Sequence, residues 1–144
     1  MNNYKNTIIL KNSSKQLFDI VIDVESYPLF LPWCTSSRII EKISNTNFNA
    51  ELSVGYKALD EKYVSRINAI TNKEINSEAI SGPFKLLKST WTFNDIDKNN
   101  CKVDFFIQYK FKSFFLEKIM GSLFKRATIK MLDAFEKRAK ELYK

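Results

Sequence analysis

In the first quarter of the chain, the spacing of hydrophobic residues changes from a pattern typical of a strand to one typical of a helix. Residues 4–11 carry a short apolar run that predicts a strand. Ser13 and Gln16 then have the spacing of a capping box. The apolar residues after them recur at helical spacing, which predicts a helix that ends near Asp23. Two prolines limit the next segment to a single helical turn at residues 27–31.

Apolar and polar residues alternate over most of the chain after residue 33, which is the period of strands with one buried and one solvent-facing side. Residues 48–57, 63–69 and 103–112 show this most clearly, and a weaker run at residues 75–81 has mostly Ser and Ala at its inward positions. Turn-forming residues separate the runs, at residues 44–47, 71–73, 82–83 and 97–100. We therefore expect an antiparallel meander of six strands after the first helix.

The helical period returns after Ser113. An apolar stripe runs from Leu116 to Leu142, with lysine and arginine side chains mostly outside it. A helix of this length needs a surface on which to bury its stripe, and the concave face of the sheet is the only large partner. The pattern predicts an α+β helix-grip fold, with residues 1–144 as one domain. In this fold a curved antiparallel sheet of about seven strands wraps around one long C-terminal helix.

The groove of such a fold is seldom filled completely by side chains, which predicts an elongated cavity for an apolar ligand. The chain has 12 Phe, 6 Tyr and 2 Trp, and the small residues Ser77, Ala79 and Ser81 would leave room between the rings. For any single ring, packing in a solid core is the more common role. The candidate ligand-binding residues are Phe30, Leu31, Trp33, Phe84, Trp91, Phe93, Phe105, Ile107, Tyr109, Met120 and Phe124.

Residues 28–33 contain two prolines that fix a rigid turn and present an apolar cluster. This cluster can be a lid at the mouth of the cavity or a plug that closes the core, and both interpretations stay open. We expect Phe84, which follows a Gly-Pro turn, to border the same opening. Arg38 is expected to form a structural salt bridge and Cys34 to be a small core residue.

The composition argues against catalysis and metal binding. The chain contains no histidine and has two cysteines, Cys34 and Cys101. The commonest general base and metal ligand is therefore missing, so we expect no metal, no required cofactor and no enzyme activity. Few cysteines and the lack of a signal-peptide pattern predict a cytoplasmic protein.

Positive charge is concentrated toward the C-terminus. The net charge is +7, and residues 110–144 carry ten Lys or Arg against four Asp or Glu. A basic segment can bind an anionic membrane, which would place the protein at the inner face of the cytoplasmic membrane, or it can bind nucleic acid. A solvated helix face without a partner is the third interpretation.

Three motifs resemble those of a known family. Residues 24–34 read VESYPLFLPWC and are closed by SR at 37–38; GPFKLL at 82–87 is followed by WTF at 91–93; and AFEKRA stands at 134–139. In this order they resemble the coenzyme Q-binding START-like family, part of the polyketide cyclase/dehydrase superfamily that includes the bacterial ribosome association toxin. The resemblance implies a helix-grip fold and a lipid or quinone ligand.

The resemblance implies three possible functions. Trp33 before Cys34 is similar to the quinone-binding branch, so a ubiquinone carrier that supports respiration is the first hypothesis. The second is a toxin-like inhibitor that keeps ribosomal subunits from associating. The third is a polyketide cyclase or aromatase, whose acid or base would be Glu51, Asp104 or Tyr109, although no spacing singles out one of them.

Overall fold

The structure, a computed structural model, describes residues 2–56 and 59–143, without the side chains of residues 56 and 59. Its elements follow the predicted order. They are β1 (Asn2–Leu10), α1 (Ser14–Ile22), the 3-10 helix η1 (Val24–Leu29), β2 (Cys34–Ser44), β3 (Asn47–Tyr56), β4 (Leu59–Ile70), β5 (Glu74–Ala79), β6 (Phe84–Asp97), β7 (Asn100–Phe111), α2 (Phe114–Ile129) and α3 (Met131–Leu142).

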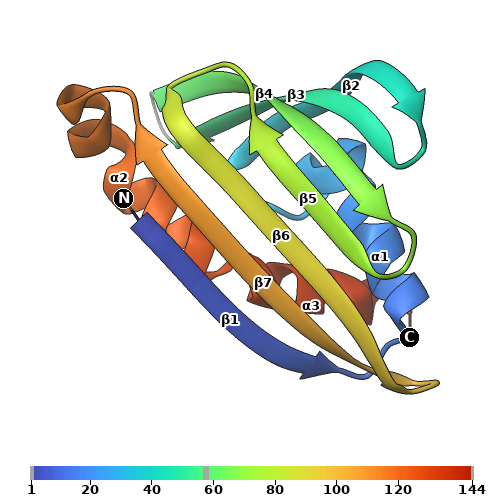
Figure 1. The fold of residues 1–144 in the computed structure, drawn as a ribbon. Helices are drawn as coiled ribbons and strands as arrows, with labels where there is room; N and C mark the ends of the chain where they lie inside the picture. Colours follow the sequence, from blue (N-terminus) through green and yellow to red (C-terminus); the bar gives the residue numbers. More distant parts are fainter. Residues whose placement is uncertain (1, 57–58, 144) are drawn as a thin grey trace.

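Within the described residues, seven strands form one antiparallel sheet in the order β1-β7-β6-β5-β4-β3-β2. From β2 to β7, each strand pairs with the strand that follows it in sequence. Strand β1 pairs with β7 and forms the edge of the sheet opposite β2. The sheet curves over α1, α2 and α3, which lie together on one of its faces (Figure 1). The predicted α+β helix-grip fold, with six strands after the first helix, is confirmed.

Helix α1 begins as the capping box predicts. The Ser13 side chain accepts a hydrogen bond from the backbone N–H of Gln16, and the Gln16 side chain accepts one from the Ser13 backbone N–H. The next residue fixes the helix to the sheet, because the Ser14 N–H and hydroxyl donate to Asp95 on β6 at 2.9 and 2.7 Å. This contact holds the apolar face of α1 against the sheet.

The C-terminal helix was predicted as one continuous element, and the structure corrects this. It breaks at Lys130, where ψ is 0° and the N–H is shared between the carbonyls of Arg126 and Thr128. The break lets Phe124 in α2 and Phe135 in α3 both face the curved sheet, where both are buried. No proline or glycine marks the break, and the apolar residues keep helical spacing across it. The hydrophobic pattern therefore cannot reveal it.

Three smaller expectations also differ from the structure. The helical turn predicted at residues 27–31 is a 3-10 helix that begins earlier, at Val24. Leu142, at the end of the predicted apolar stripe, is half exposed. The last pair of the alternating run in β3, Tyr56 and Lys57, lies outside the residues whose side chains the structure describes.

Candidate ligand-binding site

A cavity of about 120 Å³ lies between the inner face of the sheet and the helices. Its walls come from strands β3 to β7, from the segment around η1, and from the region where α2 meets α3. Among the described residues, none that lines the cavity has a charged side chain. Its volume is close to that of an engineered apolar cavity of ~150 Å³ that binds benzene, so it can hold about one six-membered ring.

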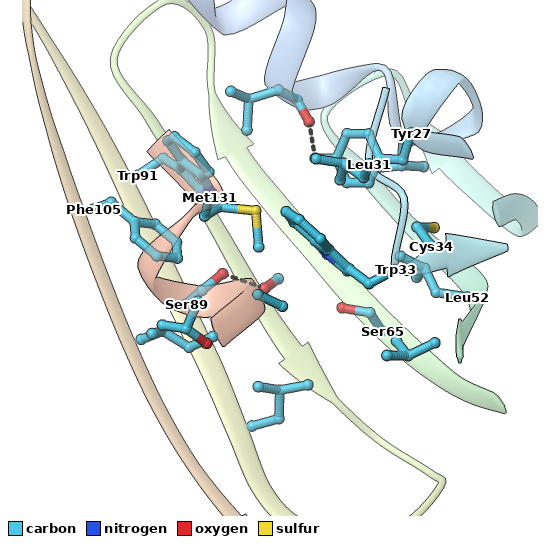
Figure 2. Close-up of a pocket in the computed structure, with 18 of the residues that line it drawn as sticks. Tyr27, Leu31, Trp33, Cys34, Leu52, Ser65, Ser89, Trp91, Phe105 and Met131 are labelled. Atoms are coloured by element: carbon cyan, nitrogen blue, oxygen red, sulfur yellow. Dashed lines mark hydrogen bonds between the residues drawn. The ribbon is translucent and has the colours of Figure 1, made fainter. Parts of the chain in front are cut away.

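One row of residues in the cavity wall has short side chains at its centre. Ser77 on β5 pairs with Ser89 on β6, and their flanking partners are Ile67 on β4 and Ile107 on β7. The two serine hydroxyl groups hydrogen-bond each other with an O–O distance of 2.6 Å (Figure 2). Because serine side chains are short, the middle of this row does not reach the helices, and the space above it stays open.

The proline-containing turn directs Trp33 into the cavity. The Trp33 carbonyl accepts a hydrogen bond from the Gly55 N–H at 2.9 Å, and the Cys34 N–H donates to the Leu31 carbonyl at 3.0 Å. These bonds fix the backbone on both sides of the indole ring. Figure 2 shows Trp33 entering the pocket from the segment before β2, on the same side as Tyr27 and Leu31. The turn is thus part of the cavity wall.

The titratable groups of the wall are held neutral by burial. The Tyr27 hydroxyl donates to the Val21 carbonyl, and its ring packs on Phe135 with centroids 5.5 Å apart. Burial raises the pKa of Tyr27 and of Tyr63 well above the usual range of a phenol. Burial also raises the pKa of the Cys34 thiol to about 11. The site therefore presents hydroxyl and thiol groups, and no charge, to a ligand.

Six of the eleven candidate ligand-binding residues line this cavity: Leu31, Trp33, Trp91, Phe105, Ile107 and Phe124. The other five lie outside its lining. Phe30 packs against Phe135 and below the Arg138 guanidinium, and Phe93 packs against Phe18 of α1. Met120 is fully buried in the core, and Tyr109 lies behind the ring of Phe124. Whether the six residues bind a ligand stays a prediction.

The position of Phe84 differs from the prediction that this residue borders the opening beside the proline turn. Its side chain is buried and packs on the rings of Tyr63, Phe111 and Phe124. The turn before it explains this position. Gly82 has φ of +105°, and a Cβ at this residue would lie 2.4 Å from the Cβ of Tyr63. Only glycine permits so close an approach, which carries Phe84 into the core.

Sequence reasoning left out many of the lining residues, both apolar and polar, and the polar ones are the more informative. Ser65, Ser89, Tyr63 and Thr128 line the cavity but were not among the candidates. All but Thr128 stand on strands, at inward positions of an alternating run, where a hydroxyl is unusual. Inward serines in an alternating run indicate space in the core. This conclusion was drawn from the sequence only for the run that contains Ser77.

The residues proposed for acid–base chemistry do not meet. Glu51 forms a salt bridge with Arg38 at 3.3 Å, and both are on the side of the sheet away from the cavity. Asp104 accepts a hydrogen bond from the Thr7 hydroxyl on the edge strand β1. Tyr109 is buried outside the lining, and burial raises the pKa of its phenol. The structural salt bridge expected for Arg38 and the core position expected for Cys34 are confirmed.

In the described part of the chain, no three acidic or cysteine side chains gather as a possible metal site. Among residues 2–56 and 59–143, no helix combines the length and apolar character needed to cross a bilayer.

The fold and site agree with comparisons to known proteins. A family model described as "Polyketide cyclase / dehydrase and lipid transport" matches residues 11–136. The chain belongs to this family. Members of the polyketide cyclase and lipid-transport family can share a fold and differ in function. The names of individual relatives therefore indicate which functions to consider.

Relatives in this family carry names from more than one function. The chain is 48% identical to the ribosome association toxin RatA of Rickettsia prowazekii over 148 aligned residues, which cover all of both proteins. It is 31% identical to the mitochondrial coenzyme Q-binding protein COQ10 homolog B of Xenopus laevis, over 97% of this chain and 59% of that protein. The higher identity is with the toxin, whereas Trp33 before Cys34 favoured the quinone-binding branch.

A solved structure supports the fold. The ZhuI aromatase/cyclase from Streptomyces sp. R1128 superposes with a TM-score of 0.86, over 99% of this chain and 96% of that one. The two sequences are 12% identical, so this likeness concerns the fold alone.

Proposed function

We propose that this protein binds an uncharged, ring-bearing apolar molecule of the ubiquinone type in the cavity between the sheet and helices α2 and α3. The observation that carries the proposal is the cavity itself, with its apolar and aromatic wall and its hydrogen-bonded Ser77–Ser89 pair. A quinone has the matching chemistry, because its ring is flat and apolar and its carbonyl oxygens accept hydrogen bonds from hydroxyl groups.

The size of the cavity limits how such a ligand would sit. About 120 Å³ accommodates one ring but not a long isoprenoid tail, since pockets that enclose drug-sized ligands measure roughly 300–1,000 Å³. The tail would therefore lie outside the cavity or widen the groove. The similarity to a protein named for coenzyme Q binding supports the choice of ligand. A carrier of this kind needs no catalytic step, in keeping with the scattered positions of Glu51 and Asp104.

The test is organic extraction of the purified protein, followed by mass spectrometry of the apolar molecules that co-purify. We expect a quinone in near-stoichiometric amount. The variant Ala127→Phe should lose it, because Ala127 lines the cavity and a phenyl ring there would fill the space. Ala134→Phe is the matched control, since this residue is partly buried on α3 outside the cavity lining. An empty wild-type protein that also takes up no added quinone would refute the proposal.

A second candidate function is binding to ribosomal subunits so as to hinder their association. It is favoured by the 48% identity to a protein named as a ribosome association toxin. The basic C-terminal helices fit this function, because their exposed side chains include Lys118, Lys125, Arg126 and Lys137 and phosphate contacts need only such groups.

Co-sedimentation with isolated ribosomal subunits at low and high salt tests this second function. If it is correct, binding weakens as salt rises and is reduced by Lys125→Gln with Arg126→Gln. The control Lys42→Gln with Lys73→Gln removes two exposed charges outside the C-terminal helices, one near the end of β2 and one in the turn between β4 and β5, and should bind normally. Absence of binding at low salt would exclude this function.

A further inference from the structure

The first turn of α2 exposes two adjacent aromatic rings. Phe114 is 83% and Phe115 69% solvent-exposed, and every other aromatic side chain that the structure describes is at least partly buried. The backbone beneath them is well defined, because the Ser113 hydroxyl caps the helix by accepting from the Leu116 N–H at 3.1 Å. Two neighbouring rings in water are costly unless a partner covers them.

These rings stand at a projecting corner of the molecule. Figure 1 shows the first turns of α2 extending past the end of β7. The segment is tied to the sheet just before the helix, where the Lys112 N–H donates to the Pro83 carbonyl at 2.9 Å. By the strand register, Phe84 and Phe111 pair at this same end of the sheet, and Trp33 is bonded to the end of β3 there. The two rings are therefore accessible at this end of the sheet.

The exposed residues that flank the two rings in sequence are mainly basic. Lys110 and Lys112 precede them, Lys118 follows one turn later, and all three are exposed. Lys85 is exposed on the neighbouring strand β6, next to the pair formed by Phe84 and Phe111. Within residues 110–118 the single acidic residue is Glu117, which is partly buried and accepts a hydrogen bond from Asn2. The two exposed rings therefore stand in a segment whose exposed charged side chains are basic.

We propose that Phe114 and Phe115, with Lys110, Lys112 and Lys118, form a docking site for a membrane surface that contains anionic lipids. Phenyl rings insert at the boundary between headgroups and acyl chains, and lysines at the same depth meet lipid phosphates. A bilayer satisfies both features at once. Duplex nucleic acid would match the lysines and leave the rings in water.

The test is flotation of the full chain with lipid vesicles. We expect binding to phosphatidylcholine vesicles that contain about one-third phosphatidylglycerol, weak binding to phosphatidylcholine alone, and a loss of binding as salt rises. Replacing both rings by Phe114→Ser with Phe115→Ser should weaken binding to the anionic vesicles by roughly tenfold or more. Lys110→Gln with Lys112→Gln should reduce both the affinity and its salt dependence.

The matched control is Ile43→Ser with Ile70→Ser. These residues are 71% and 56% exposed and lie at the opposite end of the sheet, so the control removes exposed apolar surface without touching the corner. It should bind vesicles as the wild type does. The proposal is overturned if the wild type does not float with anionic vesicles, or if the control loses as much binding as the ring variant. It is also overturned if the ring variant floats normally and instead loses binding to ribosomal subunits.

Discussion

Two neighbouring cross-strand rows on the inner face of the sheet differ in how far their side chains fill the groove below the helices. In the row that contains Ser77 and Ser89, the central side chains are short and the space above them is the cavity. In the next inward row Ile75, Trp91 and Phe105 lie side by side, and Trp91 packs on Phe105 and on Phe135 of α3 with centroids 4.6 and 4.8 Å apart. Both rows cross the same hydrogen-bonded strands, β5, β6 and β7. The side-chain volume in each cross-strand row therefore decides how much of the groove above that row stays open.

The largest effect is expected from emptying the filled row. Trp91→Ala removes the ring that joins the sheet to α3, and we expect a loss of about 3–5 kcal/mol in the free energy of unfolding. Urea unfolding followed by far-ultraviolet circular dichroism measures it. A loss below about 1 kcal/mol would mean that the row is not packed as described.

A smaller effect on stability, but a complete effect on binding, is expected from filling the hollow row. Ser77→Val with Ser89→Val adds apolar volume at the cavity wall and removes the hydrogen bond between the two hydroxyl groups. We expect the free energy of unfolding to change by less than about 1.5 kcal/mol, while quinone binding is lost. Equilibrium unfolding and ligand titration on the same preparation measure both.

The adjacent pair on the outer face gives the control for this variant. Thr90 donates a hydrogen bond to Asn76 at 2.8 Å, between the same two strands but on the side away from the cavity. Thr90→Val removes a comparable bond without narrowing the cavity, and ligand binding should persist. Equal loss of binding in both variants would show that the strand pair as a whole, and not the hollow row, controls binding.

The last prediction concerns the pH dependence of stability. Burial raises the pKa of Cys34, in the cavity wall, and of Cys101, in the solid part of the core, to about 11 each. A cysteine in the unfolded chain titrates near ~8.5. Between these values the unfolded chain releases protons that the folded chain keeps. The stability is therefore full below pH ~8.5 and falls as the pH rises toward 11.

Urea midpoints measured between about pH 7 and pH 10 test this dependence. Cys34→Ala should make the fall shallower, and so should Cys101→Ala, even if either variant is less stable at neutral pH. Tyr27 and Tyr63 act in the same direction, because burial raises their pKa values as well. Stability that rises with pH over this range would contradict the burial of these groups.

Much of this architecture could be predicted from the sequence, because it depends on local period. The alternation in β7 and the capping box of α1 each fix an element and its buried face without knowledge of its neighbours. The break at Lys130 could not be predicted, since the apolar residues keep their helical phase across it.

The site was less accessible to prediction, since it depends on register between strands. Alternation shows that Ser77 and Ser89 point inward, but only the pairing of β5 with β6 places them side by side. Phe84 was predicted at the opening because a ring at the tip of a turn is costly to expose without a partner. The close approach of Gly82 to Tyr63, which buries that ring, is a contact between the turn after β5 and strand β4, and the local pattern of either segment does not encode it.

The central claim is that the hollow row holds an uncharged ring, and tryptophan fluorescence tests it directly. The chain has two tryptophans, Trp33 and Trp91, and both line the cavity. A quinone bound there would quench their emission. Titration with a short-tailed ubiquinone should give saturable quenching with one site per chain, which persists in Thr90→Val and is absent in Ser77→Val with Ser89→Val. Quenching that never saturates, or that is the same in the valine double variant, would contradict the account.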